Sequence, residues 1–281
     1  MKFKNILVYL DLGESNEDRV ASALAIAGLH GAALTGVVVN PLPSSVILQK
    51  LGLAGNQDVL ERARADAQST FDSFRERAAE AGVEADCFTL ECVESEAPER
   101  LARLARVYDM ALLRQANPDA DNTAFVASLS EEVMFSSGRP VLYMPYIGAH
   151  EIPFHRGLIA WDGSKASARA VHDALPLLEN MDQVTILVID SGKIQRYHDD
   201  VQPGEGLSRH LGRHGIDSEI RRMLLDSDIS TSSMILNEVS NTSADLLVMG
   251  GYGTPKLREI VLGGVTRTVL ESMTVPVLMS H

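Results

Sequence analysis

A glycine-rich segment between residues 250 and 264 has residue types and spacing that could do chemistry. Its glycines stand at Gly250, Gly253 and Gly263, in the pattern G-x2-G-x9-G. An apolar run typical of a buried parallel strand precedes it, and residues 265–270 after it suit a helix. Glycine lets a backbone approach an anion, and the free N–H groups at a helix start point at that anion. The segment therefore predicts a phosphate cradle; the alternative is a glycine-rich surface loop.

The spacing of these glycines is neither the dinucleotide fingerprint G-x-G-x-x-G nor the P-loop G-x4-G-K-[ST]. With the strand before it and Pro-Val-Leu after it, at residues 276–278, the segment resembles the nucleotide-binding signature of the universal stress protein family. In that family the third glycine is usually followed by Ser or Thr, whereas Gly264 follows it here. Thr266, two residues later, offers another hydroxyl.

The chain contains two copies of one unit, seen as four matched pairs of segments. Asp11 of the first copy corresponds to Asp162 of the second at an offset of 151 residues (162 − 11), and the offset falls to 136 (275 − 139) near the end of the copies. The length difference therefore lies in the middle, where the first copy has a long helix near 58–81 and the second a shorter stretch near 204–214. The matched segments are 5–11 with 156–162, 34–39 with 184–189, 108–113 with 244–249, and 139–142 with 275–278.

Each copy alternates short apolar strands with amphipathic helices, which predicts a doubly wound α/β fold with a parallel sheet. The resemblance covers essentially all 281 residues. It implies two Rossmann-like domains, of the adenine nucleotide alpha hydrolase-like type, each a five-stranded parallel sheet of order 3-2-1-4-5 with helices on both faces. We expect the domains at residues 1–147 and 153–281. The predicted strands lie near 4–10, 34–40, 84–92, 109–114, 140–144, 156–162, 184–190, 217–225, 245–250 and 275–280.

The two copies differ at every glycine of the motif. At the constant offset of 136, Arg114, Asn117, Ala127 and Ser128 occupy the places of Gly250, Gly253, Gly263 and Gly264. A Cβ at each of these positions fills space that a phosphate would need. The first domain is therefore predicted to be a degenerate, structural copy, and only the second to bind a ligand.

The resemblance also implies which residues of the second copy form the site. The family uses an acid at the end of strand 1 near the ribose or a metal ion, which by position is Asp162, and an apolar residue at the end of strand 2 against the adenine, which is Val188. Asp162 could instead be only the cap of the helix that begins near Gly163. The predicted nucleotide-binding set is Ala160, Asp162, Val188, Met249, Gly250, Gly253, Gly263, Gly264, Val265 and Thr266.

On this resemblance the chain is expected to be a stress-response module that binds ATP or AMP in its second domain, with Mg2+ if the ligand is ATP. Asp162 is the expected metal contact, only through the Mg2+ that ATP carries. The alternative is a nucleotide-independent interaction or signalling module of the same fold, which Gly264 in place of a hydroxyl favours. An enzyme of this fold is a third reading, and the lack of a positioned base or nucleophile argues against more than slow ATP hydrolysis.

Charge and composition exclude other classes. The net charge of −13 argues against nucleic acid, which requires clustered Lys and Arg. No stretch approaches the ~20 apolar residues of a membrane span, and the start of the chain resembles a first strand more than a signal peptide. Cys87 and Cys92 have no metal spacing and are expected to be reduced, buried residues of a cytoplasmic protein.

The two predicted fifth strands bear on how the copies assemble. The short apolar fifth strands, 141–144 and 277–280, are expected to meet antiparallel in an internal pseudo-dimer, because an exposed apolar edge invites pairing. A further homodimer through the outer helices is left open.

His210 and His214 have the four-residue spacing of zinc ligands, but no third ligand accompanies them, so that a solvated basic helix is the better interpretation.

Overall fold

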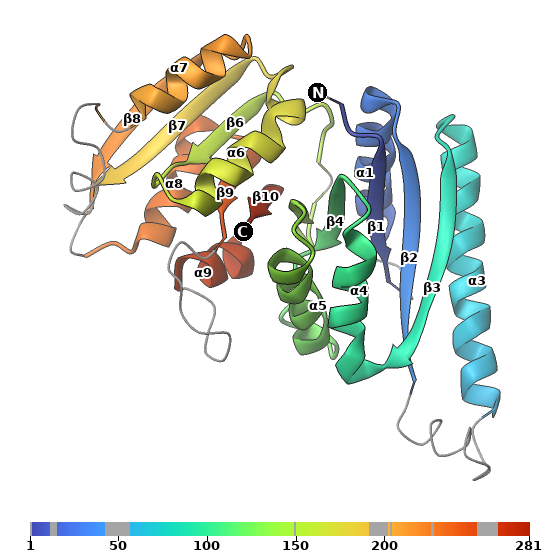
Figure 1. The fold of residues 1–281 in the computed structure, drawn as a ribbon. Helices are drawn as coiled ribbons and strands as arrows, with labels where there is room; N and C mark the ends of the chain where they lie inside the picture. The colour runs from blue at the N-terminus through green and yellow to red at the C-terminus, as the bar shows by residue number, and fades with distance from the viewer. Residues whose placement is uncertain are drawn as a thin grey trace. The chain divides into compact units, whose positions relative to one another are not determined.

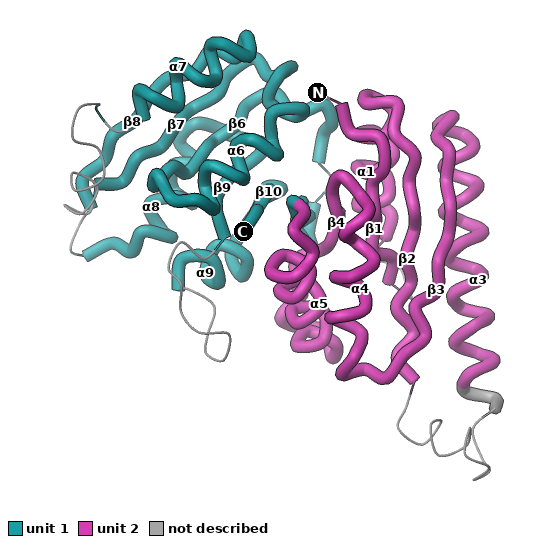
Figure 2. Tube along the Cα trace, viewed as in Figure 1, with its two compact units in different colours: residues 1, 140–281 teal, residues 2–139 magenta. Residues whose placement is uncertain are grey.

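The computed structural model describes residues 2–11, 16–42, 57–148, 150–190, 202, 204–225, 228–251 and 264–281. The chain divides into two compact units, Lys2–Arg139 and Pro140–His281, which Figure 2 shows in magenta and teal. The division falls just before the fifth strand of the first sequence copy, so this strand belongs to the second unit. The sequence domains predicted at 1–147 and 153–281 remain a prediction about the repeat.

The first unit is a parallel sheet with the strand order β3-β2-β1-β4. Its central strands β1 and β4 are near-continuous apolar runs, as parallel strands covered on both faces require. The helix α1 ends at Gly31, whose φ of 62° is the left-handed conformation that glycine adopts most easily. The elements, labelled in Figure 1, are β1 (Asn5–Leu10), α1 (Glu17–His30), β2 (Ala33–Leu42), α3 (Gln57–Glu80), β3 (Ala85–Val93), the 3-10 turn η2 (Glu94–Glu96), α4 (Ala97–Ala105), β4 (Met110–Arg114) and α5 (Thr123–Ser136).

The second unit repeats this design and adds two strands, β10 and β5, in the order β5-β10-β9-β6-β7-β8. All its strand pairs are parallel except β5 with β10. Its elements are β5 (Val141–Met144), β6 (Arg156–Ala160), α6 (Lys165–Leu178), β7 (Gln183–Asp190), α7 (Glu205–Arg213), β8 (Ser218–Leu224), α8 (Thr231–Thr242), β9 (Leu246–Gly250), α9 (Gly264–Ser272) and β10 (Val277–Ser280).

The predicted fold is confirmed. With β5 counted as the fifth strand of the first copy, both copies have the order 3-2-1-4-5, and every predicted strand is present within a few residues of its expected bounds. The predicted length difference is also found, because α3 has 24 residues and α7 has 9. These helices connect the second and third strands of their copies, where the offset between the copies changes.

The two fifth strands meet antiparallel, as predicted. Val277 pairs with Tyr143, Leu278 with Leu142 and Met279 with Val141. Every residue of β5 and β10 is buried, so the pairing closes an apolar edge that would otherwise be open to other chains.

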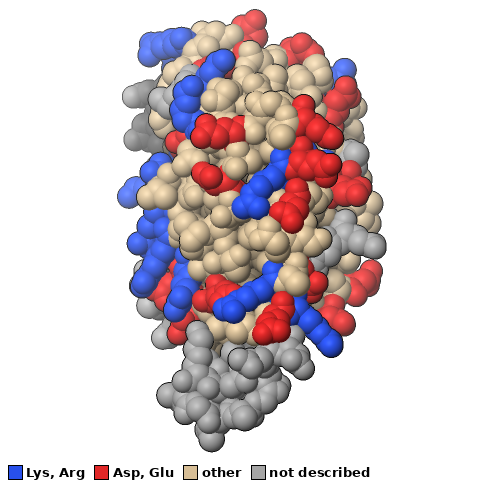
Figure 3. Space-filling view, turned by 90° about the vertical axis from the view of Figure 1, so that its right-hand side faces the viewer, with Lys and Arg blue, Asp and Glu red and all other residues tan. Residues whose placement is uncertain are grey.

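The described surface carries charges of both signs. The face drawn in Figure 3 shows Lys and Arg side chains interspersed with Asp and Glu. Several ion pairs of the chain lie on single helices, such as Arg267 with Glu271 on α9 at 2.8 Å. Among the described residues, no helix has the length and apolar character of a membrane span.

The β5–β10 pairing yields the first prediction. Leu278→Ala should lower the free energy of unfolding by about 2–5 kcal/mol, because it removes a fully buried side chain from packed strands. Leu224→Ala is the matched control: this side chain is 80% exposed, and its loss should change the free energy by less than about 0.5 kcal/mol. Urea unfolding followed by the fluorescence of Trp161, which lies in the same unit, measures both. Equal effects of the two substitutions would contradict the proposed contribution of the β5–β10 pairing to stability.

Candidate functional site

The candidate site lies where the parallel strands β6 and β9 end. Ala160 and Met249 are register partners on these adjacent strands, and the chain reaches Asp162 two residues after Ala160 and Gly250 one residue after Met249. The structure therefore brings these four predicted residues to one carboxyl edge of the sheet. In open α/β folds this edge, at the point where the strand order reverses, is where ligands bind.

Gly250 is required here for space. A Cβ built on it would lie 2.4 Å from the backbone nitrogen of Ser167 and 2.7 Å from the carbonyl carbon of Ala166, both in the first turn of α6. Its backbone is not left-handed, so the requirement is closeness and not conformation. A side chain at position 250 therefore has no room between the end of β9 and the start of α6.

Asp162 presents its carboxylate at the start of the same helix. It is exposed, and its Oδ1 accepts a hydrogen bond from the backbone nitrogen of Ser164 at 2.9 Å. The cap of α6 is Ser164, whose Oγ accepts from the backbone nitrogen of Ser167 at 3.1 Å. The alternative prediction, in which Asp162 itself caps the helix, is therefore wrong. A carboxylate at this position also faces the positive end of the helix dipole.

Val188 lies apart from these four residues. Ala160 has Leu187 as its register partner on β7, and successive side chains of a strand point to opposite faces. Val188 is therefore on the other face of the sheet, 1% exposed, where it packs beneath Gly204 at the start of α7.

The glycine loop is described only at its two ends. Gly253 and Gly263 lie outside the described residues, Gly264 begins α9, and Val265 is half-buried. Thr266, the hydroxyl offered in place of the missing Ser or Thr, is only 3% exposed. The first turn of α9 contains no acidic residue, so its positive end is not neutralised from within the helix.

Two residues that the sequence did not single out hold the start of this loop. Gly251 donates its backbone N–H to the carbonyl oxygen of Ser280 at 2.9 Å. The Nδ1 atom of His281 lies 3.2 Å from the carbonyl oxygen of Gly251. Only the pairing of β9 with β10 places these residues there, and no motif in the sequence marks them.

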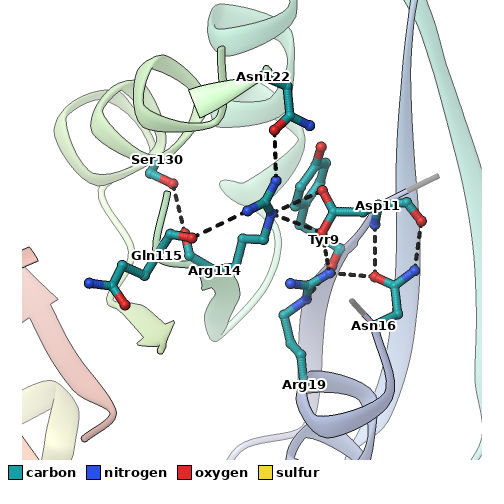
Figure 4. Close-up of polar contacts among 8 residues, drawn as sticks. All are labelled: Tyr9, Asp11, Asn16, Arg19, Arg114, Gln115, Asn122 and Ser130. Carbon is teal, nitrogen blue, oxygen red and sulfur yellow. Dashed lines mark hydrogen bonds and ion pairs between the residues drawn. The ribbon is translucent and has the colours of Figure 1, made fainter. Parts of the chain in front are cut away.

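The corresponding edge of the first unit is filled by a buried ion network, drawn in Figure 4. The Asp11 carboxylate accepts from Arg19 Nη2 at 2.8 Å and from Arg114 Nε at 2.9 Å. The three residues are 7%, 4% and 6% exposed. Arg114 occupies the place of Gly250, so a guanidinium stands where the second unit has only backbone.

Neighbouring polar groups fix this network in place. Arg114 Nη2 donates to Asn122 Oδ1 at 3.1 Å, and Arg19 Nε donates to the carbonyl oxygen of Tyr9 at 2.8 Å. The Asn16 side chain bonds both the backbone N–H and the carbonyl oxygen of Asp11. Burial lowers the pKa of the Arg19 guanidinium, and the Asp11 charge opposes that shift. Burial, and next the charge of Asp11, raise the pKa of Tyr9.

This network was only half visible in the sequence. The loss of the glycines was predicted, but the pairing of Arg114 with Asp11 was not. The available signal was that an arginine replaces glycine at the end of strand 4, opposite an acid at the end of strand 1.

Comparisons with known proteins show which family and which solved structures the chain resembles. Residues 153–281 match the model of the Universal stress protein family. A universal stress protein from Archaeoglobus fulgidus DSM 4304 is similar over 98% of this chain and 97% of that chain, with a TM-score of 0.73 and 16% identity. A putative universal stress protein from Pseudomonas aeruginosa UCBPP-PA14 covers 98% of this chain and 92% of that chain, with a TM-score of 0.59 and 14% identity.

A shorter match is the universal stress protein from Archaeoglobus fulgidus in complex with dAMP, at a TM-score of 0.35 and 18% identity over 51% of this chain and 98% of that chain. None of the curated proteins compared with the chain matches it.

Fold and site thus define a tandem α/β protein with one repeat unit per sequence half. Its C-terminal half is a universal stress protein domain, and the whole chain has the fold of tandem universal stress proteins.

The contrast between the two acids gives a second prediction. Asp11→Ala should cost about 3–5 kcal/mol of unfolding free energy, because it leaves two buried guanidinium groups without their shared carboxylate. Asp162→Ala, at the equivalent position, removes an exposed side chain and should cost less than about 0.5 kcal/mol. Thermal unfolding followed by circular dichroism compares them, and a larger loss for the Asp162 variant would contradict the assignment.

Proposed function

We propose that the protein binds one adenine nucleotide per chain, ATP or AMP, at the carboxyl ends of β6 and β9. The family match of residues 153–281 and the glycine pattern that follows β9 support this assignment. In the proposed complex the phosphates lie on the backbone of the glycine loop and at the start of α9, and Asp162 accepts hydrogen bonds from the ribose hydroxyls. Ala160 and Met249 line the base.

The observation that carries the proposal is the opposite treatment of one position in the two halves. Gly250 leaves no room for a side chain beside α6, and Asp162 is exposed. In the first unit Arg114 stands in place of Gly250 and is bound to Asp11. The first unit thus pairs its acid with its own guanidinium groups, whereas the equivalent acid of the second unit stays exposed to a ligand.

With ATP as the ligand, Mg2+ would be held mainly by the phosphates, with Asp162 as a protein contact. Mg2+ is commonly bound by one or two carboxylates together with substrate phosphates. Among the described residues, no group of three or more His, Cys, Asp and Glu side chains could hold a metal ion by itself. The donors present therefore fit a metal that arrives with its nucleotide.

The proposed role is binding and signalling in a stress response, not fast catalysis. The described residues at the carboxyl ends of β6 and β9 offer a carboxylate and backbone groups, but no side-chain nucleophile paired with a base. The second candidate is a nucleotide-independent interaction module in the cytoplasm. The burial of Thr266 favours it, because no hydroxyl among the described residues of the first turn of α9 is exposed in place of the missing Ser or Thr.

Calorimetric titration of the full chain with ATP, ADP and AMP tests the proposal. We expect one site per chain. Two sites would contradict the assignment of the first unit as structural, and no binding at millimolar nucleotide would transfer the function to the interaction module.

The third prediction concerns Asp162. Asp162→Ala should weaken nucleotide binding by about 1–3 kcal/mol, the cost of removing the charged partner of a hydrogen bond. Asp182→Ala is the control, because Asp182 is an exposed acid of the same unit that pairs with His155 at the other end of the sheet. The same titration measures both variants, and equal affinities would remove Asp162 from the site.

The fourth prediction concerns the glycine loop. Gly263→Val should abolish binding, because a branched side chain would occupy the space of the phosphate. Ala127→Val, at the equivalent position of the first unit, should leave the affinity unchanged. A normal affinity in the Gly263 variant would show that the loop does not hold the phosphates.

A further inference from the structure

A cavity of the C-terminal unit lies on the opposite face of its sheet from Ala160 and Met249. It has a volume of about 340 Å³ and opens between α6 and α7. Its floor is apolar, formed by Trp161, Val171 and Leu207, and its mouth is bordered by Gly206 and His210. Trp161 follows Ala160 directly, so that its side chain points to the other face of the sheet.

The first unit has a groove at the equivalent place, between α1 and α3. At the offset of 151, Leu10 corresponds to Trp161 and Val20 to Val171. The glycines that end the second helices, Gly82 and Gly215, both with positive φ, set an offset of 133 there (215 − 82). The groove has a volume of about 400 Å³, and at the offset of 133 its residues Ser73, Phe74 and Arg77 correspond to Gly206, Leu207 and His210.

The two grooves differ in the side chains that connect their helices. In the first unit, Arg77 Nη2 donates to the carbonyl oxygen of Glu17 at 3.1 Å, which ties α3 to α1 across the groove. In the second unit, His210 replaces this arginine and Ala168 replaces Glu17. Gly206 also replaces Ser73, and no atom lies within 4 Å of where its Cβ would be. Loss of the long polar side chains leaves an apolar cavity with an indole in its floor.

We propose that this cavity is a second ligand site, for a small planar aromatic molecule with one polar or anionic group. The volume falls at the lower end of the range for small-molecule sites, which are mostly apolar with a few polar groups. Trp161 supplies an aromatic surface for stacking or edge contact, and aromatic pairs favour these arrangements. His210 at the mouth is the hydrogen-bonding group for the polar end of the ligand. The site does not depend on the nucleotide proposal.

The test uses 8-anilinonaphthalene-1-sulfonate as the probe and the full-length folded chain. Trp161 is the only tryptophan, so energy transfer from its indole reports that the probe is bound to the chain, and the variants below localise it. We expect saturable transfer with one probe per chain. Saturating ATP should leave the probe bound, because Ala160 and Met249, which line the base in the proposed nucleotide complex, lie on the other face of the sheet.

Matched variants on one helix localise the probe. Gly206→Leu should fill the cavity and weaken binding of the probe by about tenfold or more, a loss of ~1.4 kcal/mol or more in binding free energy. Gly212→Leu, on the same helix and also with open space around its would-be Cβ, does not line the cavity and should bind the probe like the wild type. His210→Arg imports the bridging arginine of the first unit and should also weaken binding. Melting temperatures show that each variant is folded.

Three outcomes would overturn the proposal. Absence of saturable energy transfer would show that the cavity takes no aromatic ligand. An unchanged affinity in a folded Gly206→Leu variant would place the probe elsewhere. Displacement of the probe by ATP would show that the cavity is part of the nucleotide site. Failure of the chain to bind ATP would contradict only the nucleotide proposal and would not affect the result with the probe.

Discussion

The antiparallel pairing of β5 with β10 is the contact on which the second unit depends. A sheet that ended at β10 would expose a row of unpaired backbone groups flanked by apolar side chains, which is a template for aggregation. β5 covers this edge, and β5 comes from the first sequence copy. The compact units and the sequence repeats therefore divide the chain at different places. The first copy supplies a strand to the sheet of the second, which is a structural role that does not require the glycine motif.

Much of the fold could be predicted from the sequence because parallel strands buried on both faces leave uninterrupted apolar runs, such as 246–249. The repeat also allows each element to be predicted in both copies and compared. The strand order could be inferred only through the family resemblance. The pairing of β5 with β10 followed from a physical argument about edges. Element bounds were least certain where strands pass into loops: the second copy's first strand ends at Ala160, two residues before the expected Asp162.

The site could be predicted less completely than the fold. Sequence spacing indicated that Asp162 and Gly250 meet, and strand register brings them to one edge. Spacing carried no information on the face of each residue, so Val188 was grouped with Ala160 although strand alternation places them on opposite faces. The reason for Gly250 was also hidden. Only the coordinates show that α6 passes within 2.4 Å of its missing Cβ.

The Asp11–Arg19–Arg114 network explains how a binding crevice becomes structural. Asp11, unlike its exposed counterpart Asp162, is a buried charge, which is costly unless it is paired and hydrogen-bonded. Two arginines supply the pairing, and Asn16 and Asn122 satisfy further donors and acceptors. Removing one partner from such a network costs more than the network contributes as a whole, because the others remain buried and charged. Arg114→Gly alone would therefore not free the acid, because Arg19 would still hold Asp11. An edge like that of the second unit requires changes at several of these positions together.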